Sequence, residues 1–476
     1  MKKIIISLFV LLAAVNAFAQ SDDDLFGDDS FFMDDAFDTF DTFSSGDDSF
    51  FSSDDDMFFD DGIEEYHESS NKTDLAKGII FEDGSVKLGG SFSTSVDMST
   101  VLYDKTQKDF ADNLKNTTLI PFIGADISLD ARPNQDLRLY TKVSTSTEDL
   151  FDVKEMFTDF ITSDNISFRF GLHTVTWGTG VFYSPVSDMI NTSSIDPEHT
   201  DLQVDGSINL RTLVTIPGTM NSLWFYVIPD LGTKLAIDTA LAAKYEFLVG
   251  GWEFGTGAFY KYETAPKIML TASGSVKKVS LFGEAVYQYG SDREWIEKKS
   301  FDDKSSVLKA TAGFSYMKSD PSIMIMAQYF YDGNDFAVNN LMDYAFYFSN
   351  LGLIKEFSTK GHNVAAMLNF GKLFDNDKLS FSVLGIAHLT KPKIHVLTPL
   401  EEMMAETTLG KENYPILQAA INSVKATPIA IFNATLNYSP VDNVSMNIGP
   451  SILVSDWKKE PQVLLKIGFT LGGGNF

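Results

Sequence analysis

Regular alternation of apolar and polar residues, repeated along most of the chain, is the feature that most constrains this sequence. Between Lys234 and Val249 mostly apolar residues occupy the odd positions, and lysine, aspartate, glutamate and alanine occupy the even ones. A period of two kept this long indicates a β-strand longer than the usual ~5–6 residues. Similar alternation recurs at 137–143, 252–262, 279–289, 364–370 and 379–389. The sequence therefore predicts an all-β fold.

Two architectures alternate in this way, a soluble β-sandwich or propeller and a transmembrane antiparallel β-barrel. A strand crosses a bilayer with ~9–11 tilted residues, and several of the runs are at least that long. Tyrosines such as Tyr260, Tyr262, Tyr287 and Tyr289 stand at strand ends, where a bilayer interface selects them. We therefore predict a transmembrane antiparallel β-barrel over residues 79–476, with about 16 strands (range 14–18) and an aqueous lumen.

Three long stretches do not alternate, at 183–203, 293–305 and 399–427. In a barrel with short periplasmic turns and longer outer loops, such stretches are outer loops or a plug folded into the lumen.

The first nineteen residues predict a route out of the cytoplasm. Lys2 and Lys3 precede a short apolar run, and Ala17-Phe18-Ala19 forms a small-x-small cleavage site. This pattern is typical of a cleaved signal peptide (1–19). An N-terminal membrane anchor is the alternative, although the apolar run is shorter than the ~20 residues of a spanning helix. We expect the mature protein in the outer membrane of a bacterium with a Gram-negative-type envelope.

Residues 20–78 are predicted to form a disordered acidic tail on the periplasmic side. Residues 21–68 hold sixteen Asp, three Glu and no Lys or Arg, so they carry −19 of the chain's net charge of −28. Charges this dense cannot pack into a core. Phenylalanine pairs recur after aspartate pairs, which favours docking to a periplasmic partner through Phe31, Phe32, Phe50, Phe51, Phe58 and Phe59. A plain spacer is the alternative, and calcium binding is poorly supported because no EF-hand spacing is present.

Composition excludes several classes of function. The chain has no cysteine, which rules out disulfides, thiol catalysis, Cys-ligated metals and a lipid-modified cysteine. A net charge of −28 argues against nucleic acid as a partner. The six histidines show no H-E-x-x-H spacing, and the sequence has no G-x-S-x-G, P-loop or dinucleotide-binding motif. We expect no enzyme activity, no cofactor and no metal.

One stretch, residues 166–191, carries the pattern Arg-x-Gly, then Trp-Gly-x-Gly, Pro, Asp and Asn. The residues that form it are Arg169, Gly171, Trp177, Gly178, Gly180, Pro185, Asp188 and Asn191. This stretch resembles a family of poorly characterised, porin-like bacterial outer-membrane β-barrels, in which Gln usually stands at the place of His173. The resemblance implies the fold and the location rather than a substrate.

The polar parity of the predicted strands supplies candidates for a pore lining. Arg169, His173 and Trp177 share one parity, and the neighbouring phenylalanines have the other. The alternative is a structural corner in which Trp177 packs over glycines and Arg169 pairs with a carboxylate of the wall. The full set of pore-lining candidates is Arg138, Lys142, Arg169, His173, Asp238, Lys244, Glu246, Glu253, Lys261 and Glu284. Because their signs are mixed, we expect weak ion selectivity.

The C-terminal strand shows an irregular pattern. A terminal aromatic such as Phe476 is the signal that barrel-assembly machinery reads in outer-membrane barrels. Leu465, Ile467 and Phe469 have the opposite parity, and a bulge within 472–474 would restore the register.

The function predicted from the sequence is a porin-like channel for passive or weakly selective passage of small hydrophilic solutes. The alternative is a surface adhesin or structural barrel whose acidic tail docks a periplasmic partner. The expected partners are outer-membrane lipid and the assembly machinery, and a homo-oligomer is compatible with the sequence.

Overall fold

The computed structural model describes residues 86–475, except 105–116, 148–149, 201, 320, 335–336, 341, 344–345, 347–359, 391–392, 396, 405–406, 408–428, 442–443 and 456–459. The predicted signal peptide, the acidic tail with its six phenylalanines, and Phe476 lie outside the described residues.

Eighteen strands make up one antiparallel sheet. In chain order they are β1 (Val86–Tyr103), β2 (Thr118–Asn134), β3 (Leu137–Ser146), β4 (Asp152–Ser163), β5 (Ile166–His173), β6 (Ser207–Thr215), β7 (Ser222–Ile228), β8 (Ala240–Val249), β9 (Trp252–Tyr260), β10 (Lys267–Val276), β11 (Val279–Tyr289), β12 (Ser306–Lys318), β13 (Ile323–Asp332), β15 (Gly361–Phe370), β16 (Leu379–His388), β18 (Ala430–Val441), β19 (Val444–Val454) and β20 (Gln462–Asn475). Other elements in the described part of the chain include the parallel pair β14 (Ala337–Val338) and β17 (Lys393–Ile394), helix α3 (Asp292–Ile296), and the single 3₁₀ turns η5 (Ser187–Met189), η6 (Ala236–Asp238), η7 (Phe301–Asp303) and η9 (Leu373–Asp375).

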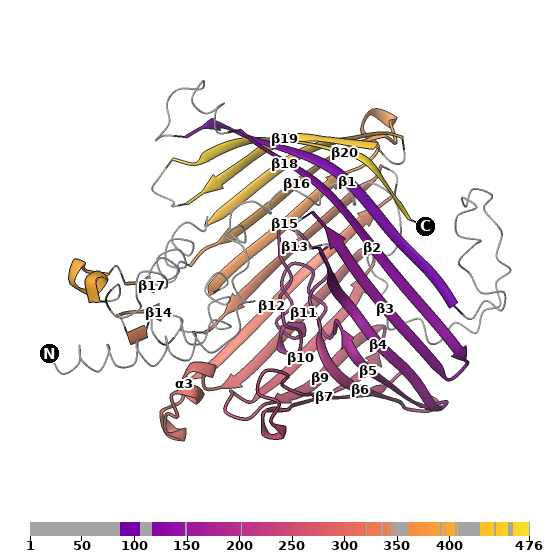
Figure 1. Cartoon of the computed structure of the whole chain (residues 1–476), viewed down its shortest axis with the longest axis vertical. Coiled ribbons are helices and arrows are strands. Elements are labelled where there is room, and N and C mark those ends of the chain that lie inside the picture. Colours follow the sequence, from indigo (N-terminus) through magenta and orange to yellow (C-terminus); the bar gives the residue numbers. More distant parts are fainter. Residues whose placement is uncertain are drawn as a thin grey trace.

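The sheet closes on itself to form a barrel. Each strand pairs with the next one along the chain, and β20 pairs with β1 from Ser91↔Asn475 to Tyr103↔Val463. Figure 1 shows the order as a progression from indigo β1 to yellow β20, which lie side by side. Eighteen strands are the upper end of the predicted range, and the predicted antiparallel barrel is confirmed. Closure removes the sheet edges that would otherwise present unpaired backbone groups to lipid.

The two ends of the barrel differ in the length of their connections. At one end the connections are short turns, of two residues at 135–136, 164–165, 250–251 and 277–278, and longer only at 216–221, 319–322 and 371–378. At the other end the connections include 174–206, 290–305, 333–360 and 389–429. The first residue of β1 and the last residue of β20 both lie at the end of the barrel with the short turns. This asymmetry is the one seen between periplasmic turns and outer loops in transmembrane barrels.

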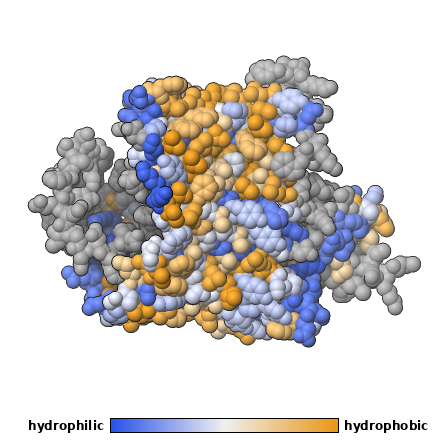
Figure 2. Space-filling model, turned by 180° about the vertical axis from the view of Figure 1, so that it is seen from behind, coloured by the Kyte–Doolittle hydropathy of each residue, from blue (hydrophilic) through white to orange (hydrophobic). Residues whose placement is uncertain are grey.

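Apolar side chains point outward and polar ones inward, as the alternation predicts. On β2 the outward residues Leu119 and Ile123 are 65 % and 60 % exposed, and on β10 Ile268 and Leu270 are 58 % and 59 % exposed. Apolar residues cover much of the outer surface in Figure 2, with hydrophilic residues toward its margins. So much exposed apolar surface is stable only against lipid. Among the described residues, no helix is long and apolar enough to cross a membrane.

The prediction of one strand from Lys234 to Val249 is wrong for its first part. The strand β8 begins at Ala240, and the preceding residues form a turn at the long-loop end. The side chain of Asp230 accepts hydrogen bonds from the N–H groups of Gly232 and Thr233. The backbone carbonyl of Asp230 accepts a third from the Lys234 N–H. Lys234 then adopts a left-handed conformation with φ 55°. These local hydrogen bonds override the alternation, because they offer the backbone a turn instead of a ladder.

The last strand has a bulge, and it lies one residue before the predicted 472–474. Thr94 pairs with Gly472 and Ser95 with Thr470, so Leu471 is the extra residue. Gly472 takes φ +155° at this point. Beyond the bulge, Gly474 pairs with the outward-facing Phe92, so the parity of β20 has switched.

Helix α3 stabilises the long connection between β11 and β12. Ser291 and Glu294 form a capping box, in which Ser291 Oγ accepts from the Glu294 N–H and Glu294 accepts from the Ser291 N–H. Glu294 also accepts hydrogen bonds from the N–H and hydroxyl of Ser305, at 3.0 and 2.9 Å. Burial by itself raises the pKa of Glu294, but the hydrogen bonds from Ser291 and Ser305 and from Lys299 outweigh it, so the pKa lies at about 2.

We predict that this connection loosens when Glu294 loses its charge. A carboxylate with a lowered pKa contributes stability that is present above its ordinary pKa of about 4.5 and is lost as the pH falls toward 2. The protection factors of the Ser291 and Ser305 N–H groups, measured against the intrinsic exchange rate at each pH, should fall over this range, and E294Q should already exchange faster than the wild type at pH 7. The control is E297Q, since Glu297 pairs with Arg293, four residues earlier, and with no other side chain in the described part of the protein. Equal exchange in E294Q and E297Q would contradict the prediction.

Candidate pore constriction

The chain leaves the barrel wall after His173 and returns to it at Ser207. Residues 174–206, called here the inward segment, fold into the barrel (Figure 1). The segment contacts inward side chains of several strands. Of the three long stretches predicted as outer loops or a plug, 183–203 is therefore an inward-folded one. Gly171 lies two residues before the end of β5, where only glycine fits easily. It has φ +140°, and a Cβ there would lie 2.6 Å from Phe157 Cα.

The carboxylate of Glu284, on β11, holds the first half of the inward segment. Its Oε1 accepts hydrogen bonds from the N–H groups of Thr179 and Gly180, both at 2.6 Å. Its Oε2 accepts one from the Val186 N–H at 3.1 Å, and the Ser184 hydroxyl donates to the same carboxylate. Glu284 is 4 % exposed. A buried carboxylate satisfied by four donors fixes the segment to the wall.

The two glycines of the Trp-Gly-x-Gly motif permit this close approach. A Cβ on Gly178 would overlap Ser184 Oγ and lie 2.5 Å from Glu284 Oε1. A Cβ on Gly180 would overlap the Tyr183 carbonyl oxygen. The motif therefore has a structural reason in this chain, since any larger residue would push the segment off its anchor.

Two further wall residues hold the same half. Gln328, on β13, accepts hydrogen bonds from the N–H groups of Val181 and Phe182 at 3.1 and 2.8 Å and donates to the Tyr183 carbonyl at 2.6 Å. Lys244, on β8, donates to the Trp177 carbonyl at 2.8 Å and forms an ion pair with Glu246. Glutamine suits its place, because one amide can satisfy backbone donors and an acceptor at once.

Apolar packing seals the segment against the wall on both sides of the anchor. Trp177 meets Tyr226 edge-to-face, with ring centroids 5.0 Å apart, and belongs to a buried cluster with Met269 and others. Tyr183 stacks on Phe330 at 5.1 Å within a second cluster. Together these contacts exclude water from the interface between segment and wall.

The remaining family-motif residues stabilise the segment internally. Asn191 exchanges two hydrogen bonds of 2.8 Å with the N–H and carbonyl of Val175. Pro185 is buried, and the Asp188 N–H donates to the Ser184 carbonyl at the start of η5.

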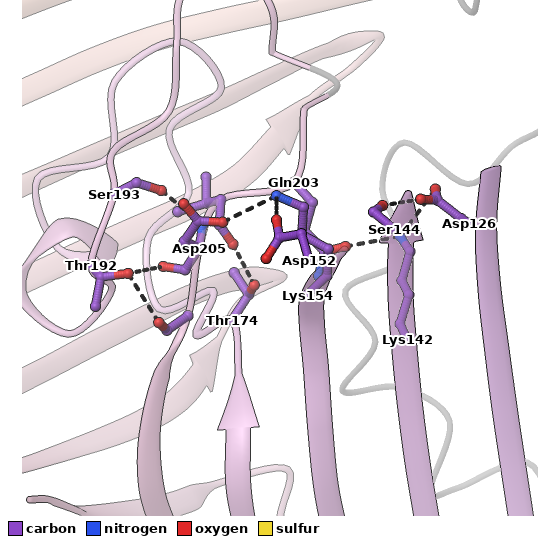
Figure 3. A network of polar contacts seen from close by, with 12 residues as sticks. Asp126, Lys142, Ser144, Asp152, Lys154, Thr174, Thr192, Ser193, Gln203 and Asp205 are labelled. Carbon is purple, nitrogen blue, oxygen red and sulfur yellow. Dashed lines mark hydrogen bonds and ion pairs between the residues drawn. The ribbon is translucent and has the colours of Figure 1, made fainter. Parts of the chain in front are cut away.

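The returning half contacts the opposite part of the wall. Lys142, on β3, donates to Gln203 at 2.8 Å, and Lys154, on β4, pairs with Asp205 at 3.4 Å (Figure 3). Glu198 interacts electrostatically with Lys466 of β20. The inward segment thus touches wall strands on several sides of the lumen and narrows it.

A row of charged residues crosses β2 to β6 on the inward face. Arg138 pairs with Asp130 at 3.1 Å and with Asp159 at 3.7 Å. Arg169 makes two hydrogen bonds to Asp159, at 2.6 and 3.1 Å, and lies 4.0 Å from the Phe157 ring centroid. Arg211 is the cross-strand neighbour of Arg169. Most of this charge is compensated within the wall, and Arg169 is only 5 % exposed.

The other predicted candidates lie in varied places. His173 is 1 % exposed and meets Phe157 edge-on at 5.8 Å. Asp238 lies in the exposed turn η6, so it does not belong to a strand face as expected. Lys261 follows the end of β9 and pairs with Asp230 at 2.7 Å, and Glu253 is exposed beside the β8–β9 turn.

Sequence reasoning missed Gln328, Asp159 and Gln203. Gln328 has the polar parity of an alternating strand, but a single glutamine gives no sign that it binds backbone 145 residues away. Asp159 could have been found as the cross-strand partner of Arg169 once β4 and β5 were paired.

These features define a transmembrane β-barrel with a loop folded into its lumen. The sequence matches no family model and no curated protein. Solved structures similar to the chain include Pseudomonas aeruginosa OprD, with 8 % sequence identity over 82 % of this chain and 95 % of that chain and a TM-score of 0.43. Pseudomonas aeruginosa OccK3 is similar with 9 % identity over 84 % of this chain and 98 % of that chain and a TM-score of 0.45. Salmonella typhi OmpF in complex with daunomycin is also similar (11 % identity, 83 % and 99 %, TM-score 0.39). These values are too low to carry a functional inference, so function is argued below from the barrel itself.

We predict that E284A releases the first half of the inward segment. Removing the carboxylate leaves the three N–H groups and the Ser184 hydroxyl without their acceptor. Breaking a buried charged network of this kind destabilises the folded state by roughly 3–5 kcal/mol. Chymotrypsin should then cleave after Tyr183, which is 4 % exposed in the wild-type protein. E284Q should be intermediate, and E253A, at an exposed strand end, should behave as wild type. Wild-type resistance in E284A would show that Glu284 is not the anchor.

Proposed function

We propose that this protein is an outer-membrane channel for passive passage of small hydrophilic solutes, narrowed by the inward segment. The observation that carries the proposal is a closed ring of eighteen strands with a polar inward face and a loop fixed inside it by Glu284, Gln328 and Lys244. A ring of 16–18 strands is wide enough to leave an aqueous lumen, unlike one of eight.

The anchored segment supports a channel rather than a solid stalk. A surface adhesin would use the barrel only to present its outer loops, and nothing would favour three separate wall side chains committed to one loop inside the lumen. In a channel, a fixed constriction sets the size limit for the solute.

The orientation follows from the two ends of the barrel. If the short turns face the periplasm, as in other bacterial barrels, Val86 at the start of β1 lies on the periplasmic side.

Weak ion selectivity is part of the proposal. Arg138 and Arg169 are paired with Asp130 and Asp159, so the row of charge on β2 to β6 adds little net charge to the lumen. We therefore expect a reversal potential close to zero under a salt gradient.

The test is single-channel conductance of the refolded protein in planar bilayers, with and without residues 21–68. We expect discrete conductance steps in both proteins, and larger, noisier steps in E284A because the constriction is released. A protein that is folded and heat-modifiable on gels but silent would overturn the channel and favour the adhesin or docking function. A change on truncation would assign the tail a role as plug.

A further inference from the structure

The inward face of β15, β16, β18 and β19 differs from the rest of the wall, because it is polar without charge. Its polar residues are asparagine, serine and threonine, together with His388 at the end of β16, which hydrogen-bonds Asn363. The described parts of these four strands place no Asp, Glu, Lys or Arg on that face. We call the group Asn369, Ser382, Asn433, Thr435, Asn437 and Ser451 the amide–hydroxyl wall.

The strand register makes these residues neighbours. Asn369 pairs with Ser382, and Ser382 pairs with Thr435. Asn433 pairs with Ser451, and Asn437 follows Thr435 on the same face of β18. The wall is therefore a continuous patch across four strands, which is the spacing of a ligand with several hydrogen-bonding groups.

The hydrogen-bonding capacity of this patch is not used within the described part of the protein. The side-chain oxygens of Asn369, Asn433 and Asn437 and the hydroxyls of Ser382 and Ser451 have no hydrogen-bond partner there. Ser382 and Ser451 are 2 % and 0 % exposed, and Asn433 and Asn437 are 8 % and 4 % exposed. Leaving one such group unsatisfied is costly, and five in one patch point to a ligand or ordered water.

The charged row provides the contrast. Arg138, Asp159 and Arg169 satisfy one another within the wall. The amide–hydroxyl wall has no such internal network among the described residues, and its members Asn369 and Thr435 are half-buried rather than buried.

We propose that the amide–hydroxyl wall is a binding subsite for an uncharged, polyhydroxylated solute. Amides and hydroxyls both donate and accept, so they complement sugar hydroxyls, and the lack of carboxylates and basic groups gives no advantage to an ion. This inference rests on the proposed channel function and names the class of solute that the channel favours.

The test is block of the ion current by maltotriose, a neutral trisaccharide, in planar bilayers with potassium chloride. Maltotriose should block wild-type channels in a saturable way. The variant N433L/N437L, which keeps side-chain size but removes both amides, should raise the half-blocking concentration about tenfold. S451A, which removes one hydroxyl with little change in volume, should raise it about threefold and keeps the test valid if the double variant fails to fold.

The matched control is N209L, the same substitution on the inward face of β6 beside the charged row. The Asn209 side-chain oxygen also has no partner among the described residues, so this control separates the position in the amide–hydroxyl wall from the loss of an unpartnered amide alone. It should leave the half-blocking concentration within about twofold of wild type. Conducting channels that maltotriose does not block, or blocks equally in all variants, would overturn the subsite while leaving the channel in place. Strong cation selectivity without block would instead identify the oxygens as a cation path. Absence of conductance would remove the channel and the subsite together.

Discussion

The architecture of the lumen depends on one buried carboxylate. The inward segment brings backbone N–H groups into a region where the wall must satisfy them, because they have no sheet partner. Glu284 accepts from three of them and from a hydroxyl, and Gln328 satisfies the next two along the chain. The aromatic packing of Trp177 and Tyr183 is possible only once the segment is seated there. Packing then stabilises a position that hydrogen bonding has selected.

The fold was largely readable from the sequence, because one physical rule repeats in every strand. Lipid on one side and water on the other impose the alternation, so the parity of β8 and β11 could be predicted from single strands. A bulge in the last strand could be predicted in the same way, to within one residue of its position at Leu471. The same rule failed before Ala240, where Asp230 gathers local donors into a turn that happens to continue the alternating pattern. Alternation reports the face of a residue but not whether the backbone is extended.

The site was readable only in part, because its contacts join distant residues. The motif around Trp177, Gly178 and Gly180 marked the right segment, and Glu284 and Lys244 had the right parity. Their partnership could not be predicted, since Glu284 lies 104 residues from Gly180 in the chain. Asp238 shows the opposite error, in which parity suggested a wall position that the turn η6 does not allow. A face is a property of one strand, whereas a constriction is a property of the closed ring.

Closure between β1 and β20 has a consequence for the order of folding. The hydrogen bond from Thr94 to Gly472 spans 378 residues, and the whole seam joins the first and last strands of the ring. Until β20 arrives, β1 and the growing sheet each carry an exposed edge, and neither can enter lipid without unsatisfied backbone groups. A contact this non-local is slow to form. The inward segment, by contrast, needs only the strands up to β13 for its main anchors. The inward segment can therefore dock on its wall strands before β1 and β20 pair. The pairing of the last strand is then the step that commits the protein to the membrane.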